Sequence, residues 1–168
     1  HLDTQAQSEL EGLYGQLLTK SNRILDLMSS WQSHLPQNLD TSKVVGLGMN
    51  SEELSLNPRL DQSLVHDLNQ KPELPFEDGN FDAVICSLSI EYLLQPVKVL
   101  EEARRILVPG GLLLITFSNR WFPPKVTRLW TELNPFEQMA LVVQYFEAAG
   151  GFTEIETRSY RGYPRPVD

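Results

Sequence analysis

The chain has 168 residues and a formal net charge of −8, and 41% of its residues are hydrophobic. This size and composition suit one domain that buries roughly two-thirds of its unfolded surface. The acidic balance argues against a general nucleic-acid binder, because such proteins need a cationic face to displace counterions from phosphates. Every apolar run is shorter than the ~20 residues that span a bilayer, so we expect no membrane span.

Cysteine and histidine content narrow the chemistry further. The single Cys86 excludes an internal disulfide framework and a Cys-rich zinc site, and it favours a reducing compartment. The three histidines share no metal-ligand spacing such as H-x-x-x-H, so no metal is expected. The first residues, "HLDTQAQSEL", lack the basic and apolar parts of a signal peptide. Because the chain also starts without Met, we treat 1–168 as one domain that is open to truncation at both ends.

Hydrophobic periodicity predicts alternating strands and helices. Apolar residues recur at helical spacing in three segments, and the last of these ends at Gly150 and Gly151. The middle helix is expected to stop at Pro109-Gly110-Gly111. Short apolar or alternating runs between these segments predict six strands. The expected helices are 8–20, 96–107 and 135–151, and the expected strands are 23–28, 43–49, 62–68, 81–89, 112–118 and 152–160.

This alternation indicates an α/β fold with a mostly parallel sheet and helices on both faces. In such sheets ligands bind beyond the carboxyl ends of the strands, at a topological switch point. Two long irregular segments, 69–80 and 118–134, also favour function, since long ordered loops in compact domains often carry it. The candidate site residues therefore follow the strands, at 26–31, 48–50, 67–69, 86–89 and 118–121.

The helix expected over 96–107 carries adjacent acidic and basic pairs. Glu101 and Arg105 lie four residues apart, a spacing that predicts an ion pair on one helix face. A charge-laced surface helix explains the two arginines without a nucleic-acid partner.

The central third of the sequence carries a family resemblance. The segment "DLNQKPELPFEDGNFDAVICSLSIEYLLQPVKVLEEARRILVPGGLLLITFSN" resembles class I S-adenosylmethionine-dependent methyltransferases, in particular the type 11 methyltransferase domain. The marks are Asp67, then "LPFEDGNFDAVIC", then "E-x-x-R-I-L-x-P-G-G" from Glu101 to Gly111. The stretches "DLMSSWQSHLP", "GLGMN" and "FSNRWFP" resemble a divergent cyanobacterial, algal and plant subgroup with a degenerate glycine loop. The resemblance implies a Rossmann-like methyltransferase fold, with S-adenosylmethionine as cofactor and S-adenosylhomocysteine as product.

The loop after the first strand departs from the family pattern. Asp26 matches the family acid, but Met28 and Ser30 stand where turn glycines belong, and each adds a Cβ that disfavours positive φ. Ser29 and Ser30 add hydroxyls, and a turn that enters a helix exposes N–H groups able to bind a carboxylate. Alternatively, Ser29 or Ser30 only caps a short helix that Pro36 ends. Both interpretations stay open.

The loop after the second strand departs more seriously. Gly48 falls where the family places an acid for the ribose hydroxyls, with Met49 and Asn50 following. Loss of that charge-assisted bond, about 1.5–3 kcal/mol, weakens binding by ~10- to 100-fold. Asn50 is an alternative ribose ligand. However, "NSEE" also fits a capping box in which Glu53 reaches back to an Asn50 N-cap, and we favour the cap.

The next two strand ends keep the family pattern. The resemblance makes Asp67 the acceptor for the adenine amino group, with Leu68 packed on the ring. Asp67 also suits a simple turn before "NQKP", but the surrounding motif favours the functional role. Cys86 and Ser87 match positions whose backbone lies along the cofactor. By itself Cys86 is more typical of a small buried residue than of a nucleophile.

The segment "SNRWFPPK" should overhang the acceptor site. Asn119, Arg120 and Trp121 are weak candidates for orienting a substrate; the alternative is a loop anchored in the core by Trp121 and Phe122. Methyl transfer needs mainly alignment and only sometimes a base, so we assign no catalytic residue. Tyr92 is the nearest alternative base or orienting group, although packing suits it better.

The sheet of the family has a seventh, antiparallel strand, and we expect this strand to be missing here. After residue 160 only "RGYPRPVD" remains, and Pro164 and Pro166 disfavour a central strand. An exposed sheet edge would invite a homodimer or another partner. The compartment expected from the subgroup and the composition is the cytoplasm or the plastid stroma.

Three functions compete at this stage. The leading hypothesis is an S-adenosylmethionine-dependent methyltransferase, with a small-molecule acceptor favoured over a protein. The altered residues Met28 to Ser30 and Gly48 motivate a catalytically inactive methyltransferase-like binding scaffold instead. The third is a related enzyme on this fold that binds another nucleotide or adenosyl ligand.

Overall fold

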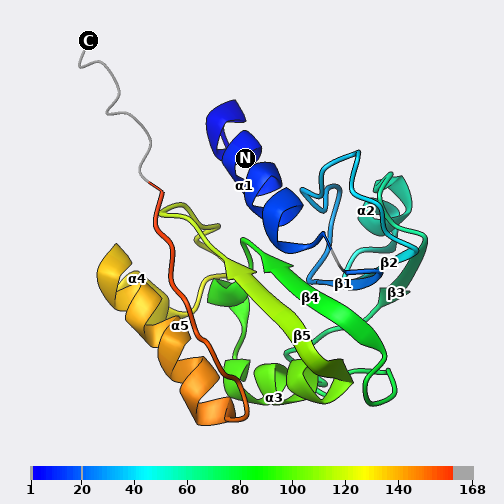
Figure 1. Cartoon of the computed structure of the whole chain (residues 1–168). Helices are drawn as coiled ribbons and strands as arrows, with labels where there is room; N and C mark the ends of the chain where they lie inside the picture. Colours follow the sequence, from blue (N-terminus) through cyan, green and yellow to red (C-terminus); the bar gives the residue numbers. More distant parts are fainter. Residues whose placement is uncertain (1, 20, 161–168) are drawn as a thin grey trace.

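The computed structural model describes residues 2–19 and 21–160, and these form a parallel sheet with helices on both faces (Figure 1). The strands alternate with helices or long loops, as the sequence predicts. In chain order the elements are α1 (Thr4–Leu17), β1 (Arg23–Leu27), β2 (Lys43–Gly48), α2 (Ser51–Leu56), β3 (Gln62–Val65), β4 (Phe81–Ser87), the 3₁₀ helix η1 (Ile90–Tyr92), α3 (Pro96–Ile106), β5 (Leu107–Thr116), α4 (Arg128–Thr131) and α5 (Pro135–Ala149).

The sheet has the strand order β3-β2-β1-β4-β5, and every neighbouring pair is parallel. Its centre is β1, where Leu25 lies opposite Val45 of β2 and Val84 of β4. Because β1 is covered on both faces, it reads as a continuous apolar run with one acid, Asp26. The chain extends the sheet toward β3 first and then toward β5, so the switch point lies between β1 and β4.

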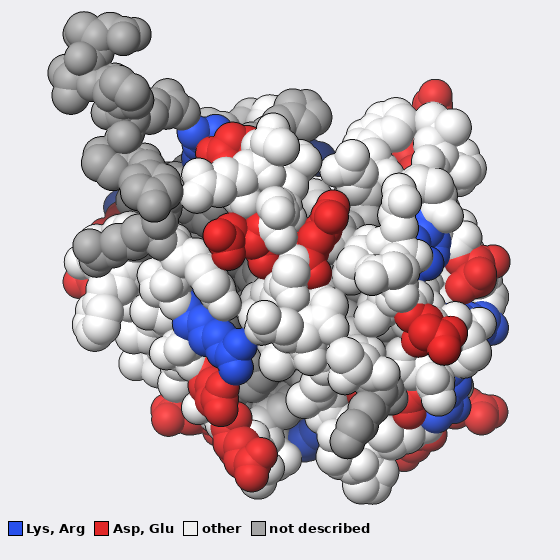
Figure 2. Space-filling model, turned by 45° about the horizontal axis from the view of Figure 1, so that its top comes forward, with Lys and Arg blue, Asp and Glu red and all other residues white. Residues whose placement is uncertain are grey.

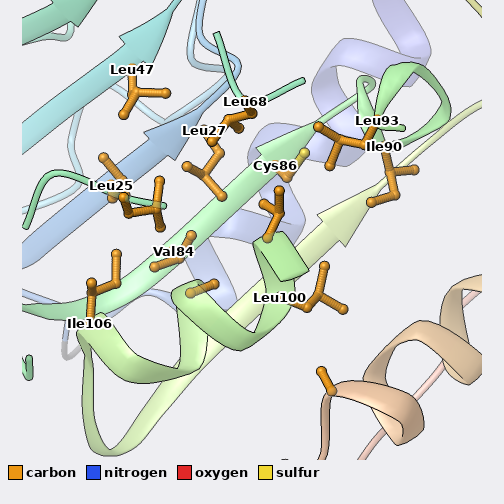
Figure 3. Packing of buried hydrophobic residues seen from close by; sticks show 14 of the residues in the cluster. Leu25, Leu27, Leu47, Leu68, Val84, Cys86, Ile90, Leu93, Leu100 and Ile106 are labelled. Atoms are coloured by element: carbon orange, nitrogen blue, oxygen red, sulfur yellow. The ribbon is translucent and has the colours of Figure 1, made fainter. Parts of the chain in front are cut away.

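Two apolar cores cover the two faces. On one face, Tyr14 and Leu18 pack on Ile24 and Ile85. On the other, α3 lays Leu100 and Ile106 against alternate residues of the same strands (Figure 3). The period of two along each strand explains this division, since adjacent residues point to opposite faces. The second core also includes Trp130 of α4 and Val142 of α5.

The helix ends follow local chemistry. Asp3 caps α1 by accepting from the Ala6 N–H at 2.8 Å. A complete capping box of Asn134 and Glu137 starts α5, and Gly150, with φ of 71°, ends it as expected. The helix α3 ends at Ile106, before the expected stop, because β5 begins at once at Leu107 and runs through Pro109-Gly110-Gly111.

Two predicted elements are wrong. Residues 28–42 contain no helix, so neither Ser29 nor Ser30 caps one. Residues 152–160 form no strand (Figure 1); they alternate in sequence, but nearly all of them are exposed and so have no apolar face to bury. Within the described part of the chain, β5 therefore pairs only with β4 and forms an edge of the sheet. The expectation that the last antiparallel strand is missing concerns residues 161–168, which lie outside the described residues.

The predicted ion pair on α3 is also wrong in its partner. Arg105 binds both carboxylate oxygens of Glu102, not Glu101, and it also donates to Asp78 and to the carbonyls of Leu74 and Phe76. These bonds anchor the long loop between β3 and β4 onto α3.

On the face shown in Figure 2, acidic and basic side chains are interspersed, without a continuous basic surface among the described residues.

Candidate functional site

The candidate site lies at the carboxyl-terminal ends of β1, β2, β3 and β4. From here on, 'the edge' means this end of the sheet, and the side of β5 away from β4 is called the β5 edge. Parallel strands bring the loops after all of them to this edge. Sequence reasoning selected these loops, and the structure brings them together. Their internal contacts decide which side chains remain available for a ligand.

The loop after β1 takes a glycine-like path without glycine. Met28 has φ of 55°, the left-handed conformation that a turn glycine would adopt. The Ser29 N–H donates to the Leu47 carbonyl at 2.9 Å, which holds the loop against the end of β2. Met28 and Ser29 therefore preserve the course of the turn, but the Met28 side chain packs against the core on the α3 side of the sheet.

Asp26 and the serines form a buried network. The Ser29 hydroxyl donates to Asp26 Oδ2 at 2.6 Å, so it satisfies the acid rather than a helix end. Burial raises the pKa of Asp26 to about 7, and hydrogen bonds from Ser29 and Ser33 oppose part of that rise. Because Asp26 is only 2% exposed, its carboxyl group supports the loop from within the protein and does not face solvent.

Asn57 completes this network, and sequence reasoning missed it. Its side-chain amide donates to the Ser30 carbonyl at 2.8 Å and to the Ser33 hydroxyl at 3.0 Å. Its carbonyl oxygen accepts from the Arg59 N–H at 3.0 Å. The only local signal was an Asn-Pro pair after α2, which indicates a turn but not a contact with a loop more than twenty residues earlier.

Gly48, at the end of β2, has no room for a side chain. A Cβ built on Gly48 would lie 2.2 Å from the Ser29 carbonyl oxygen, so no residue with a side chain fits here without moving the backbone. This contact couples the loop after β1 to the end of β2. Asn50 caps α2 by accepting from the N–H groups of Glu52 and Glu53, which confirms the cap. The Glu53 carboxylate bonds the Asn50 amide at 3.2 Å.

The loop after β3 shows the turn-forming role that was considered for Asp67, while its role toward adenine stays a prediction. Its Oδ1 accepts from the Asn69 N–H at 2.9 Å, which is the turn-forming role. Leu68 is buried beside Leu27 and Cys86 at the same edge (Figure 3). In the loop after β2, Met49 is 66% exposed, and Asn50 beside it is also exposed.

The end of β4 supplies one buried and one half-buried residue. Burial raises the pKa of the Cys86 thiol, and the charges of Glu91 and Asp26 add to the rise, so Cys86 stays a protonated thiol. The hydroxyl of Ser87 pairs with the Tyr14 hydroxyl at 2.6 Å. Tyr14 thus links α1 to this strand end, a contact that the helical pattern of α1 did not reveal.

The segment after β5 is fixed by the 3₁₀ helix η1. The Phe122 N–H donates to the Tyr92 hydroxyl at 2.9 Å, and the Thr127 N–H donates to the Glu91 carbonyl at 3.0 Å. Trp121 packs against the core, as expected for an anchor, whereas Phe122 is 55% exposed and does not anchor the loop. Asn119 and Arg120 are exposed next to this anchored segment.

Asn69 ties the loop after β3 to η1 as well. Its side-chain amide donates to the Tyr92 carbonyl at 2.9 Å, and its carbonyl oxygen accepts from the Leu94 N–H at 2.8 Å. The loops after β3, β4 and β5 are therefore linked through Asn69 and Tyr92. Tyr92 therefore positions these loops, and its use as a base or orienting group stays a prediction.

Space at the site is limited. The cavity beneath the edge has a volume of about 10 Å³, and its lining includes Met28, Leu68, Cys86 and Ile90. That volume suits at most one water molecule. A larger hollow of about 250 Å³, lined by Arg23, Lys43 and Phe76 among others, lies at the amino ends of the strands, away from this edge. In the described ranges no cluster of three or more His, Cys, Asp or Glu side chains has the arrangement of a metal site.

Comparison with known proteins gives a family match. The model described as "Methyltransferase domain" matches residues 30–115, which run from the loop after β1 into β5. A malonyl-[acyl-carrier protein] O-methyltransferase from Marinomonas sp. is 26% identical over 135 residues, covering 70% of this chain and 50% of the relative. The mitochondrial 2-methoxy-6-polyprenyl-1,4-benzoquinol methylase of Mus musculus is 25% identical over 159 residues, covering 91% of this chain and 48% of the relative. The chain thus spans about half the length of these curated relatives.

A solved structure extends the comparison to the fold. The [4+2]-cyclase SpnF matches with a TM-score of 0.64 and 21% identity, covering 87% of this chain and 58% of that chain. This similarity confirms the Rossmann-like arrangement of the sheet. It also shows that a protein named as a cyclase shares the arrangement, so the fold alone does not identify the reaction.

Proposed function

This chain belongs to the methyltransferase-domain family, and from that premise we propose that it binds S-adenosylmethionine and transfers its methyl group to a small-molecule acceptor. The observation that carries the proposal is the family match over residues 30–115, which includes the loops after β2, β3 and β4. The two curated relatives carry names of methyltransferases that act on different acceptors. We therefore propose the cofactor and the reaction class but leave the acceptor open.

The residues at the ends of β3 and β4 fit the cofactor. Asp67 is half-buried after β3, so its carboxylate is available to accept from an adenine amino group, and Leu68, buried beside Cys86, supports the loop at this point. The backbone of Cys86 and Ser87 would lie along the ligand. When bound, the cofactor would supply an activated methyl group, while these residues would hold its adenosyl part.

The ribose side fits less well. No side chain is available at Gly48, and Asn50 is engaged in the cap of α2. Ser29 is bonded to Asp26, which leaves Ser30 and the exposed Met49 nearest to that side. We infer that the cofactor is held without the carboxylate bond to ribose, and that its affinity is lower by ~10- to 100-fold for that reason.

Calorimetric titration with S-adenosylmethionine and S-adenosylhomocysteine tests this proposal. We expect micromolar binding of both ligands, weakened about 10- to 100-fold by Asp67→Ala. Asp40→Ala, which removes an exposed carboxylate from the loop before β2, is the matched control and should bind as the parent does. Absence of binding by the folded chain at millimolar ligand would refute the proposal.

The second candidate is a catalytically inactive binding scaffold. It is favoured by the Met28 side chain at the turn and by the blocked position at Gly48. It predicts that neither ligand binds and that neither Asp67→Ala nor Asp40→Ala has a measurable effect in the titration. A third candidate is a related enzyme with another adenosyl ligand; there, S-adenosylhomocysteine would fail to compete with that ligand.

The acceptor, the assembly and the compartment are proposals that need their own measurements. A panel that holds a malonyl thioester, a hydroquinone, a thiol and an amine, with tritiated methyl donor, would separate acceptor classes.

Light scattering would show whether the β5 edge supports a homodimer or another partner, since Leu112 on it is 38% exposed. In the part of the chain that is described, no helix is long and apolar enough to cross a membrane. We place the protein in the cytoplasm or plastid stroma, which fractionation of the native source would test.

A further inference from the structure

We propose that Glu91 takes the proton from the methyl acceptor, which makes that acceptor a group carrying an ionisable hydrogen: a thiol, a hydroxyl or an acidic carbon. This inference rests on the proposed function and deepens it. Glu91 lies on η1, directly after β4 and among the loops of the candidate site.

The first observation is an unpartnered carboxylate oxygen. Glu91 is 2% exposed, and its Oε2 has no hydrogen-bond partner among the described residues. Buried polar groups are nearly always paired, because an unpaired one costs about 1–3 kcal/mol. A ligand that donates a hydrogen bond would supply the partner that this oxygen lacks.

The second observation is where Glu91 lies in the chain. It is the middle residue of η1, which follows soon after β4. Its backbone carbonyl accepts from the Thr127 N–H at 3.0 Å, which fixes the segment after β5. Glu91 therefore connects the strand end proposed for the cofactor to the segment proposed for the acceptor.

The third observation is a second unpartnered atom, on the segment that Glu91 holds in place. Trp130 is 1% exposed, and its indole Nε1 also has no partner within the described ranges. Trp130 follows Thr127, whose N–H is bonded to the Glu91 backbone carbonyl, by three positions. The segment that Glu91 fixes therefore also leaves a donor without a partner.

The protonation state suits a base. Burial raises the pKa of Glu91 to about 7, and the hydrogen bond from its own backbone N–H opposes this rise. The titratable neighbours are Cys86 and Tyr92, whose pKa values are both raised, so both stay neutral at pH 7. A base works best when its pKa lies near the working pH.

In the proposed methyl transfer, the acceptor atom would form a bond to the methyl carbon. The bond between that carbon and the sulfonium sulfur would break and leave its electron pair on sulfur. Glu91 takes the acceptor's proton and becomes a neutral carboxylic acid. It returns the proton to water when the products leave.

Carbon-13 NMR of carboxyl-labelled glutamate tests the position of Glu91 without an acceptor. Its signal is assigned by its loss in Glu91→Gln, and its pKa is followed with S-adenosylmethionine or S-adenosylhomocysteine bound. The first ligand carries a sulfonium charge and the second does not, so the first alone should lower the Glu91 pKa by about one unit or more. Equal pKa values with both ligands bound would overturn this inference and leave the proposed function standing. Failure of both ligands to bind would overturn both.

Turnover supplies a second readout with any acceptor of the panel that reacts. Glu91→Gln should lower kcat by about 100-fold or more with little change in KM for the methyl donor, and Glu91→Asp should restore part of the rate. Glu147→Gln, an exposed glutamate on α5, is the matched control. Urea unfolding separates structure from chemistry: Glu91→Gln removes a buried carboxyl group with a raised pKa and should be at least as stable as the parent. A rate above one-tenth of the parent, or a rate lost only in step with stability, would overturn the proposal.

Discussion

Gly48→Ala is the sharpest test of the coupling between the loops after β1 and β2. The added Cβ would lie 2.2 Å from the Ser29 carbonyl oxygen and 3.3 Å from Leu54 Cδ2. The first contact is with backbone, so the loop must shift by roughly an ångström, because ordinary contacts start near 3.4 Å. Overpacking of this kind costs about 1–3 kcal/mol.

The shift also threatens bonds that this loop makes. The Ser29 N–H donates to Leu47, and Asn57 binds the Ser30 carbonyl and the Ser33 hydroxyl. Loss of one such buried bond adds about 1–3 kcal/mol. We therefore expect Gly48→Ala to lower the free energy of unfolding by about 2–6 kcal/mol, measured by urea denaturation at constant m-value.

Gly12→Ala is the matched control for this substitution. Gly12 lies inside α1, and a Cβ there would meet nothing within 4 Å. Alanine in place of a helical glycine should raise stability by about 0.5–1 kcal/mol. A loss of less than 0.5 kcal/mol in Gly48→Ala would refute the coupling. So would tighter binding of S-adenosylmethionine by Gly48→Asp, since that gain requires room for the acid beside Ser29.

Two further predictions concern buried charge. Because burial raises the pKa of Asp26 to about 7 in the folded chain, well above its unfolded value, its contribution to stability is full below the unfolded pKa and is lost as pH rises through about 7. Asp26→Asn should therefore gain stability relative to the parent between pH 4 and pH 7, as followed by urea unfolding at several pH values; a constant difference would contradict the buried, raised carboxyl. Arg105→Ala should cost about 1–3 kcal/mol, because Arg105 holds two carbonyls of the loop between β3 and β4 as well as Glu102 and Asp78. The control Arg128→Ala breaks only an exposed pair with Glu132 and should cost less than about 0.5 kcal/mol, so equal losses would show that Arg105 is an ordinary surface residue.

Local patterns in the sequence predicted most of the fold. The five strands β1 to β5 were predicted because buried parallel strands are short apolar runs separated by helices or turn residues. The sixth strand failed for a related reason: alternation over 152–160 records residue types but not whether an apolar face finds a partner. The family was indicated by the ordered motifs from Asp67 to Gly111, and the match over residues 30–115 confirmed it.

Local patterns were enough to indicate the alternation of strands and helices, the cap at Asn50 and the family, and to select the loops of the candidate site. Each depends on residues close together in the chain or on an ordered motif. The folded chain was needed to see that the Ser29 carbonyl blocks a side chain at Gly48, that Asn57 locks the loop after β1 and that Glu91 is buried with one carboxylate oxygen unpartnered among the described residues. These features arise between segments that are distant in sequence, where burial and contact depend on how the strands bring their loops together and not on the residues that flank them.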